Sequence, residues 1–149
     1  MEYLDQEFDN QNFVNVDFRG KSFKNAAFNG CRFENCNLSN VEVTNTKFRN
    51  AIFVESKIMG VNFSRCSKLL LDFGFSKCNI SNSIFSSLNL KGMKLVGCKI
   101  MDCDFENCDL QQANFEGSDL LNTIFSNTNL GAASFLNAVN YRIDPRQNN

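Results

Sequence analysis

The side chains of this sequence that could carry out chemistry are seven cysteines and sixteen carboxylates, and histidine is absent. Histidine is the commonest general base in proteins and a frequent metal ligand, so its absence removes a Cys–His or Ser–His nucleophile. Cysteine thiolates could still bind zinc, and the four to consider are Cys78, Cys98, Cys103 and Cys108. No Cys-x2-Cys pair is present, and the five-residue spacing points successive cysteines in different directions. Packing inside a core is therefore favoured over a zinc site.

The carboxylates are poor candidates for a catalytic or metal site. Asp102, Asp104 and Glu106 alternate along the chain as calcium ligands can. An EF-hand loop, however, needs glycine where Asn107 stands and glutamate where Ala113 stands. Paired carboxylates need a cleft for acid–base catalysis, and the chain has no glycine-rich phosphate loop. We therefore expect no catalytic residue, no bound metal and no cofactor, and a protein that is not an enzyme.

The fold that positions these groups is set by an apolar residue at every fifth position. This ladder has two blocks, and its 25 positions hold 15 of the 16 phenylalanines. The first block is Phe8, Phe13, Phe18, Phe23, Phe28, Phe33, Leu38, Val43, Phe48, Phe53, Ile58 and Phe63. The second is Phe75, Ile80, Phe85, Leu90, Leu95, Ile100, Phe105, Leu110, Phe115, Leu120, Phe125, Leu130 and Phe135. Such a fixed period indicates a repeat architecture.

The residues after each ladder position indicate a turn. An α-helix advances about 100° per residue, so it cannot return to one face every five residues. The residue two after the ladder position is Asn or Gly in 18 of the 25 units, and these residues best tolerate a positive φ. Each unit is then a short extended piece followed by a corner. Four corners close one coil, and residues 1–149 form a single all-β domain.

The cysteines fit this arrangement as small core residues. Six of them stand two residues before a ladder position, and Cys66 continues the count of the first block. Residues two apart in an extended chain point the same way, so all seven are expected to be buried. Cys78 and Cys98 are 20 residues apart and should stack as a reduced pair.

The repeats resemble those of the pentapeptide-repeat family from about Gln6 to Asn137. Ala113–Gly117 and Cys108–Gln112 are similar to its A-(D/N)-(L/F)-x-x consensus. The resemblance implies a right-handed quadrilateral parallel β-helix of about six to seven coils. The segment from Asn140 to Pro145 resembles the Asn-Tyr-x-Ile-Asp-Pro segment near the C-terminus of Qnr-type quinolone-resistance proteins. In that group a capping strand and helix support dimerisation, but this sequence ends at Asn149, so monomer and dimer both stay open.

The ladder is interrupted between Phe63 and Phe75, where the spacing is twelve instead of ten. Residues 67–74 absorb the two extra residues as a bulge or small protruding loop, with Leu70 as the next ladder residue. A docking loop is the functional alternative, and it makes Lys68 and Asp72 candidate partner-binding residues. After Phe135 the ladder stops, and residues 139–149 form a tail outside the repeats.

The charges are divided unevenly along the chain. Residues 1–18 carry five acids and no base, residues 19–99 thirteen bases and four acids, and residues 100–141 six acids and no base. In the Qnr-type branch an acidic rod is held to mimic DNA and to contact type II topoisomerases. That resemblance makes Asp102, Asp104, Asp109 and Asp119 the mimicking charges. The basic middle departs from this pattern, because it should repel a surface built to grip phosphates. A merely solvated surface, and nucleic-acid binding by the basic middle, are the competing interpretations.

We therefore predict a non-catalytic interaction protein from a bacterial cytoplasm. One hypothesis is Qnr-like binding and protection of DNA gyrase or topoisomerase IV, which gives quinolone resistance. The alternative is a rod-shaped scaffold that binds an unrelated protein partner. No signal peptide and no apolar run of membrane-spanning length is present in the sequence, so no membrane contact is expected.

Overall fold

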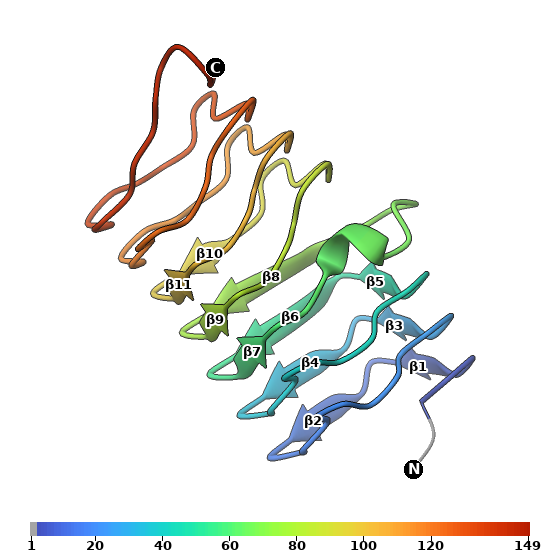
Figure 1. The fold of residues 1–149 in the computed structure, drawn as a ribbon. Helices are drawn as coiled ribbons and strands as arrows, with labels where there is room; N and C mark the ends of the chain where they lie inside the picture. The colour runs from blue at the N-terminus through green and yellow to red at the C-terminus, as the bar shows by residue number, and fades with distance from the viewer. Residues whose placement is uncertain (1–2) are drawn as a thin grey trace.

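The computed structural model describes residues 3–149 as an all-β parallel solenoid. The chain winds upward in coils of four short sides, from the N-terminal end to the C-terminal end of a rod (Figure 1). Residues 20 apart stack directly, so that Phe8 pairs with Phe28 and Phe28 with Phe48. The predicted β-solenoid is confirmed.

The strands are short because each unit leaves only a few extended residues between two corners. The three parallel sheets have the orders β1-β3-β5, β2-β4-β6-β8-β10 and β7-β9-β11. The strands are β1 (Glu7–Asp9), β2 (Asn12–Val14), β3 (Ala27–Asn29), β4 (Arg32–Glu34), β5 (Lys47–Arg49), β6 (Ala51–Val54), β7 (Lys57–Met59), β8 (Phe73–Ser76), β9 (Asn79–Ser81), β10 (Leu95–Val96) and β11 (Lys99–Met101). One short 3-10 helix, η1 (Phe63–Arg65), interrupts them.

The longest sheet draws a strand from five coils, fewer than the six to seven coils predicted. Beyond β11 the stack continues only through isolated bridges, such as Asp104 with Ile124. There the extended segments between the corners are too short to count as strands. Among residues 3–149 no helix has the length and apolarity that crossing a membrane requires.

The rod has four faces, which we name by the first full coil. Face 1 starts at Phe8, face 2 at Phe13, face 3 at Phe18 and face 4 at Phe23. Ladder residues on every face point inward and form stacked columns. On face 2 the ring of Phe33 lies 4.7 Å from Phe53 at 9°, and Phe53 lies 4.9 Å from Phe75 at 14°. Large aromatic side chains bury much apolar surface in this way, so the stacked rings form the core of the rod.

The corners confirm the turn prediction. The Asn and Gly residues two after each ladder position have positive φ, for example 57° at Asn40 and 65° at Gly20. Corner asparagines also bond from coil to coil, since Asn45 Nδ2 donates to Asn25 Oδ1 at 3.0 Å. At the C-terminal end the tail adds a further partial coil. The N–H of Asn127 donates to the carbonyl of Gln147, and that of Leu130 to the carbonyl of Asn149, both at 2.7 Å.

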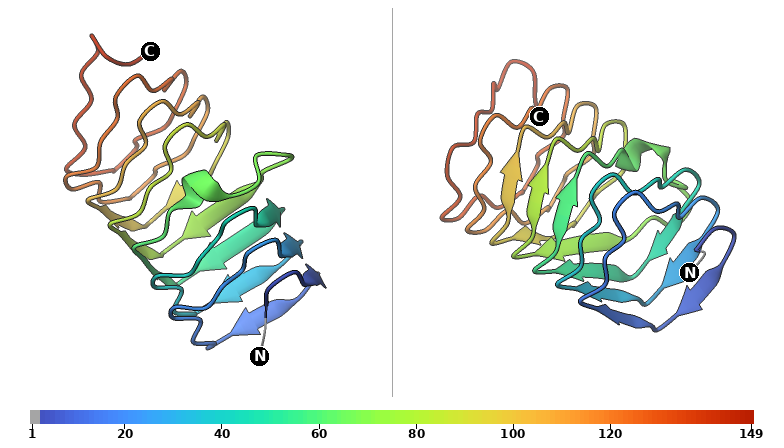
Figure 2. Two further views of the ribbon diagram at one scale, coloured as in Figure 1. Left: turned by 45° about the vertical axis from the view of Figure 1, so that its right-hand side comes forward. Right: turned by 60° about the horizontal axis from the view of Figure 1, so that its bottom comes forward.

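The prediction that Leu70 is a ladder residue is wrong. Leu70 is 71% exposed and lies in a loop that projects from the rod after η1 (Figure 2). Phe73 takes the missing core position, and its ring stacks on Phe48 at 5.8 Å and 11°. Phe73 and Phe75 are two apart in β8, so both point inward and the pair spans two columns. Leu69 and Leu70 are therefore free of any packing role, whereas Leu71 of the same loop packs partly against the core.

This correction predicts unequal effects of two substitutions. Leu70→Ser should change the free energy of unfolding by less than about 0.5 kcal/mol, because an exposed side chain is lost. Phe73→Ala should cost about 3 kcal/mol, because it leaves a cavity beside Phe48. Urea denaturation followed by circular dichroism measures both. A larger loss of stability for Leu70→Ser than for Phe73→Ala would contradict the assignment of Phe73 to the core and of Leu70 to the surface.

Candidate functional site

The cysteines lie inside the rod and form no site. All seven are buried and unbridged, as predicted. The thiol of Cys108 donates to the carbonyl of Phe85 at 2.9 Å, and burial raises the pKa of Cys103 and Cys108 to about 11. Cys78 and Cys98 stack as expected, and the contact with Cys78 together with burial raises the pKa of the Cys98 thiol. Thiols whose pKa is raised in this way, here Cys98, Cys103 and Cys108, are poor nucleophiles and poor metal ligands at neutral pH. Within residues 3–149 no three His, Cys, Asp or Glu side chains are placed to hold a metal ion.

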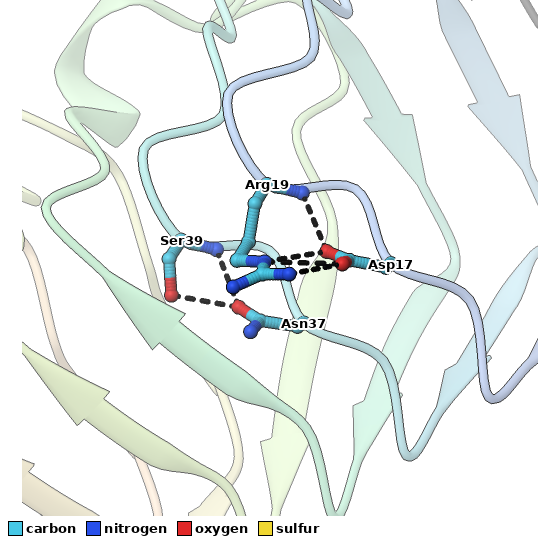
Figure 3. A network of polar contacts seen from close by, with 4 residues as sticks. All are labelled: Asp17, Arg19, Asn37 and Ser39. Carbon is cyan, nitrogen blue, oxygen red and sulfur yellow. Dashed lines mark hydrogen bonds and ion pairs between the residues drawn. The ribbon is translucent and has the colours of Figure 1, made fainter.

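The outer surface is made by the residue before each ladder position and by the two residues after it. In most units that carry an Asp or Asn before the ladder position, this side chain accepts a hydrogen bond from the N–H two residues later. In Figure 3 Asp17 Oδ1 accepts from Arg19 N at 3.1 Å, and Asn37 Oδ1 accepts from Ser39 N at 3.1 Å. The Arg19 guanidinium also binds the Asp17 carboxylate at 2.7 Å, and this contact lowers the pKa of Asp17. Carboxylates at this position therefore stabilise turns, and amides serve equally well.

Three of the four predicted mimicking acids are engaged in the fold. Asp104 Oδ1 accepts from the N–H of Glu106 at 2.8 Å. Asp109 Oδ1 accepts from the N–H of Gln111 at 3.1 Å. Asp119 Oδ1 accepts from Asn140 Nδ2 at 2.8 Å, and Asp119 lies directly above Lys99 on face 3.

The four acids do not share one surface. Asp109 lies on face 1, Asp119 on face 3 and Asp104 on face 4, while Asp102 lies at the corner between faces 3 and 4 with φ of 55°. The structure thus brings only Asp102 and Asp104 together, and Glu106 follows them on face 4. We call Asp102, Asp104 and Glu106 the acidic corner.

Two isoleucines flank the acidic corner, and the sequence analysis missed them. Ile84 lies on the coil below Asp104 and Ile124 on the coil above, and they are 38% and 54% exposed. The sequence did contain a signal for these two isoleucines, because residues about 20 apart stack in one column. The acidic corner is therefore a mixed acidic and apolar patch on face 4.

Lys68 and Asp72 belong to the projecting loop, and both are exposed. The loop tip between them carries Leu69, which is 65% exposed, and Leu70. Asp72 also lines a hollow of about 440 Å³ on face 2, which the sequence analysis did not predict. Gly74 and Gly92 line the hollow as well. Gly74 stands directly before the ladder residue Phe75, and this glycine was the available signal for the hollow in the sequence.

The comparisons with known proteins concern the family and the fold. A family model described as the pentapeptide repeat region matches residues 26–100 and 67–135, and one described as pentapeptide repeats matches residues 7–40. A trypsin-treated variant of QnrB1, a plasmid-mediated fluoroquinolone resistance protein, is 16% identical, with 100% of this chain and 86% of that chain covered and a TM-score of 0.63.

HetL, a pentapeptide repeat protein involved in heterocyst differentiation regulation from the cyanobacterium Nostoc sp. strain PCC 7120, is 17% identical. That match covers 92% of this chain and 66% of HetL, with a TM-score of 0.53. No curated protein sequence matches this chain. At these identities the likeness to solved structures concerns the fold alone.

Proposed function

The chain belongs to the pentapeptide-repeat family, and from that premise we propose that it acts by binding a protein partner on the outside of its rod, without catalysing a reaction. This proposal rests on one observation, which is that the inward positions are taken up by core packing. From Phe18 to Phe125 each inward ladder residue is buried, so only side chains of the outer faces remain free for contact. Long flat faces of this kind suit protein recognition.

The partner to test first is a type II topoisomerase, either DNA gyrase or topoisomerase IV. Two observations support this choice. Residues 100–141 carry six acids and no base, and three of these acids follow one another along the acidic corner. QnrB1, which shares the fold, is described as a fluoroquinolone resistance protein. A negatively charged rod can compete with DNA for a surface that binds phosphates. The proposal requires a bacterial cytoplasmic location.

A supercoiling assay with purified gyrase and a fluoroquinolone tests this proposal. The variant replaces Asp102, Asp104, Asp109 and Asp119 by Asn. Asparagine can accept the turn bonds of Asp104 and Asp109, as Asn37 does, and it tolerates the positive φ of Asp102, so the charge changes and the fold does not. We expect the wild type to restore supercoiling at micromolar concentration and the variant to need about tenfold more protein.

The matched control replaces four acids at the other end of the rod, Asp5, Glu7, Asp9 and Asp17, by their amides. It removes the same charge and should behave as the wild type. No effect of the wild-type protein at micromolar concentration would exclude the topoisomerase hypothesis. Equal losses in the variant and the control would show that net charge alone matters.

The second candidate is a scaffold that binds an unrelated protein. The thirteen bases among residues 19–99 favour it, because they repel a surface that grips DNA phosphates. Affinity purification from the native cell distinguishes the two candidates. Recovery of one specific protein other than a topoisomerase, at constant stoichiometry, would support the scaffold.

A further inference from the structure

The hollow on face 2 exists because two side chains are absent. Gly74 and Gly92 line it, while the neighbours of Gly74 in its column are the larger Ile52 and Lys94. Buried rings of Phe73 and Phe75 lie beneath it. The volume of about 440 Å³ is large enough to accept an apolar side chain from outside.

The backbone does not require glycine at position 74. Gly74 lies inside β8, and its φ is not positive. A Cβ atom built there would meet the carbonyl oxygen of Lys94 at 3.4 Å, which is an ordinary contact. Glycine weakens a strand, and it often marks a place where another molecule approaches closely. The absent side chain keeps the hollow open.

The loop beside the hollow presents apolar side chains that the fold does not use. Leu69 and Leu70 are largely exposed, and Phe73 already fills the core position that Leu70 would take. The chain leads from this tip through Asp72, at the rim of the hollow, to Gly74. The tip thus adjoins the rim of the hollow along the chain, and exposed apolar groups of this kind mark interaction sites.

The charges around the hollow are mainly positive. Lys94 lines it, Lys91 precedes Gly92, and Arg49 precedes Asn50 on the rim. None of these three forms an ion pair within residues 3–149, and the buried Nε–H of Arg49 has no acceptor there. Asp72 is the one acid that lines the hollow. Unpaired Lys and Arg side chains attract carboxylates.

We infer that the hollow, the loop tip and these three cations form a docking surface for an acidic segment of a protein partner. One large apolar side chain of that segment lies over Gly74 and against the loop leucines. Carboxylates on either side of it bind Lys91, Lys94 and Arg49. A second copy of this chain is a poorer occupant, because a two-fold contact would bring the same cations face to face. This surface lies on faces 1 and 2, so it is separate from the acidic corner and does not depend on the topoisomerase proposal.

Selection from a displayed library of random peptides of about twelve residues tests the inference. The purified full chain serves as bait, and the enriched peptides are then titrated by fluorescence anisotropy. We expect sequences with several Asp or Glu around one or two of Leu, Ile, Phe or Met, with affinity that falls as salt rises. Gly74→Leu fills the hollow and Lys94→Glu reverses a charge, and each should weaken binding by about tenfold or more.

The matched control is Asn12→Leu, which adds the same side chain in the same column of face 2, away from the hollow. It should bind like the wild type, and thermal melts verify that every variant is folded. Enriched peptides without acidic residues, no enrichment at all, or equal binding by Gly74→Leu and Asn12→Leu would overturn the inference. So would a wild-type dimer in analytical ultracentrifugation that Gly74→Leu abolishes, or a thymidine oligonucleotide that binds more tightly than any selected peptide.

Discussion

Phe105→Asp should unfold the C-terminal coils of the rod while the N-terminal coils stay folded. The Phe105 ring is fully buried and stacks between Phe85 at 4.7 Å and Phe125 at 5.5 Å. A carboxylate there would have no partner, and we expect a cost of more than about 5 kcal/mol. Each coil contacts only its two neighbours, so the damage should not spread far toward β1.

Hydrogen exchange with mass spectrometry measures this outcome along the chain. Amides after about residue 100 should lose protection, while those of β2, β4 and β6 should keep it. Asp104→Ser is the neighbouring control. Serine at the same position of other units accepts the same turn bond, as Ser22 does from the N–H of Lys24 at 3.2 Å. The control should change stability by less than about 0.5 kcal/mol. Small, equal effects of the two variants would contradict the inward and outward assignments.

Raising the pH from 9 to 11 should destabilise the protein through its buried thiols. Burial raises the pKa of Cys103 and Cys108 from 9.0 to about 11, so the folded state keeps protons that the unfolded state releases. A raised folded-state pKa contributes stability that is complete below pH 9 and is lost as the pH rises toward 11. At about 1.4 kcal/mol per pKa unit, each thiol should contribute roughly 2–3 kcal/mol of this loss.

Urea denaturation at several pH values measures the loss, and a double variant isolates its cause. Cys103→Ser and Cys108→Thr place hydroxyls where Thr123 and Thr128, one coil above, donate to carbonyls at 2.9 Å. These hydroxyls do not titrate in this range, so the variant should lose about 4 kcal/mol less between pH 9 and pH 11. All other side chains are the same in both proteins, so their effect cancels in the comparison. An equal loss in both would show that the thiols do not cause it.

The core was predictable because buried residues recur with the same five-residue period as the sequence repeat. Each coil adds the same inward positions, so one period places Phe8 through Phe135 and all seven cysteines. The exception is instructive. Phe73 is the one phenylalanine outside the ladder: counting back by fives from Phe75 reaches Leu70, whereas counting on by fives from Phe63 reaches Phe73. An aromatic ring that stacks on Phe48 buries more apolar surface than a leucine, so packing decides between the two counts in favour of Phe73.

The candidate surfaces were less predictable than the core. The sequence places Asp102, Asp104, Asp109 and Asp119 close together along the chain, but each five-residue step turns a corner. Neighbours in sequence therefore point in different directions, and neighbours in space are about 20 residues apart. Turn bonding adds a second ambiguity, since Asp104 and Asp109 are needed as acceptors whatever else they do. For the hollow, the glycine before Phe75 was a signal, but it did not suffice, because the hollow also depends on what surrounds Gly74.

The interchange of Asp and Asn beside the ladder has an evolutionary consequence. Asp17 and Asn37 make the same backbone contact on successive coils of face 3, one with a negative charge and one without. A single nucleotide change converts one amino acid into the other. The surface charge of this rod can therefore change by genetic drift, because an exchange of Asp and Asn hardly affects folding. Related solenoids can in this way diverge toward partners of opposite charge.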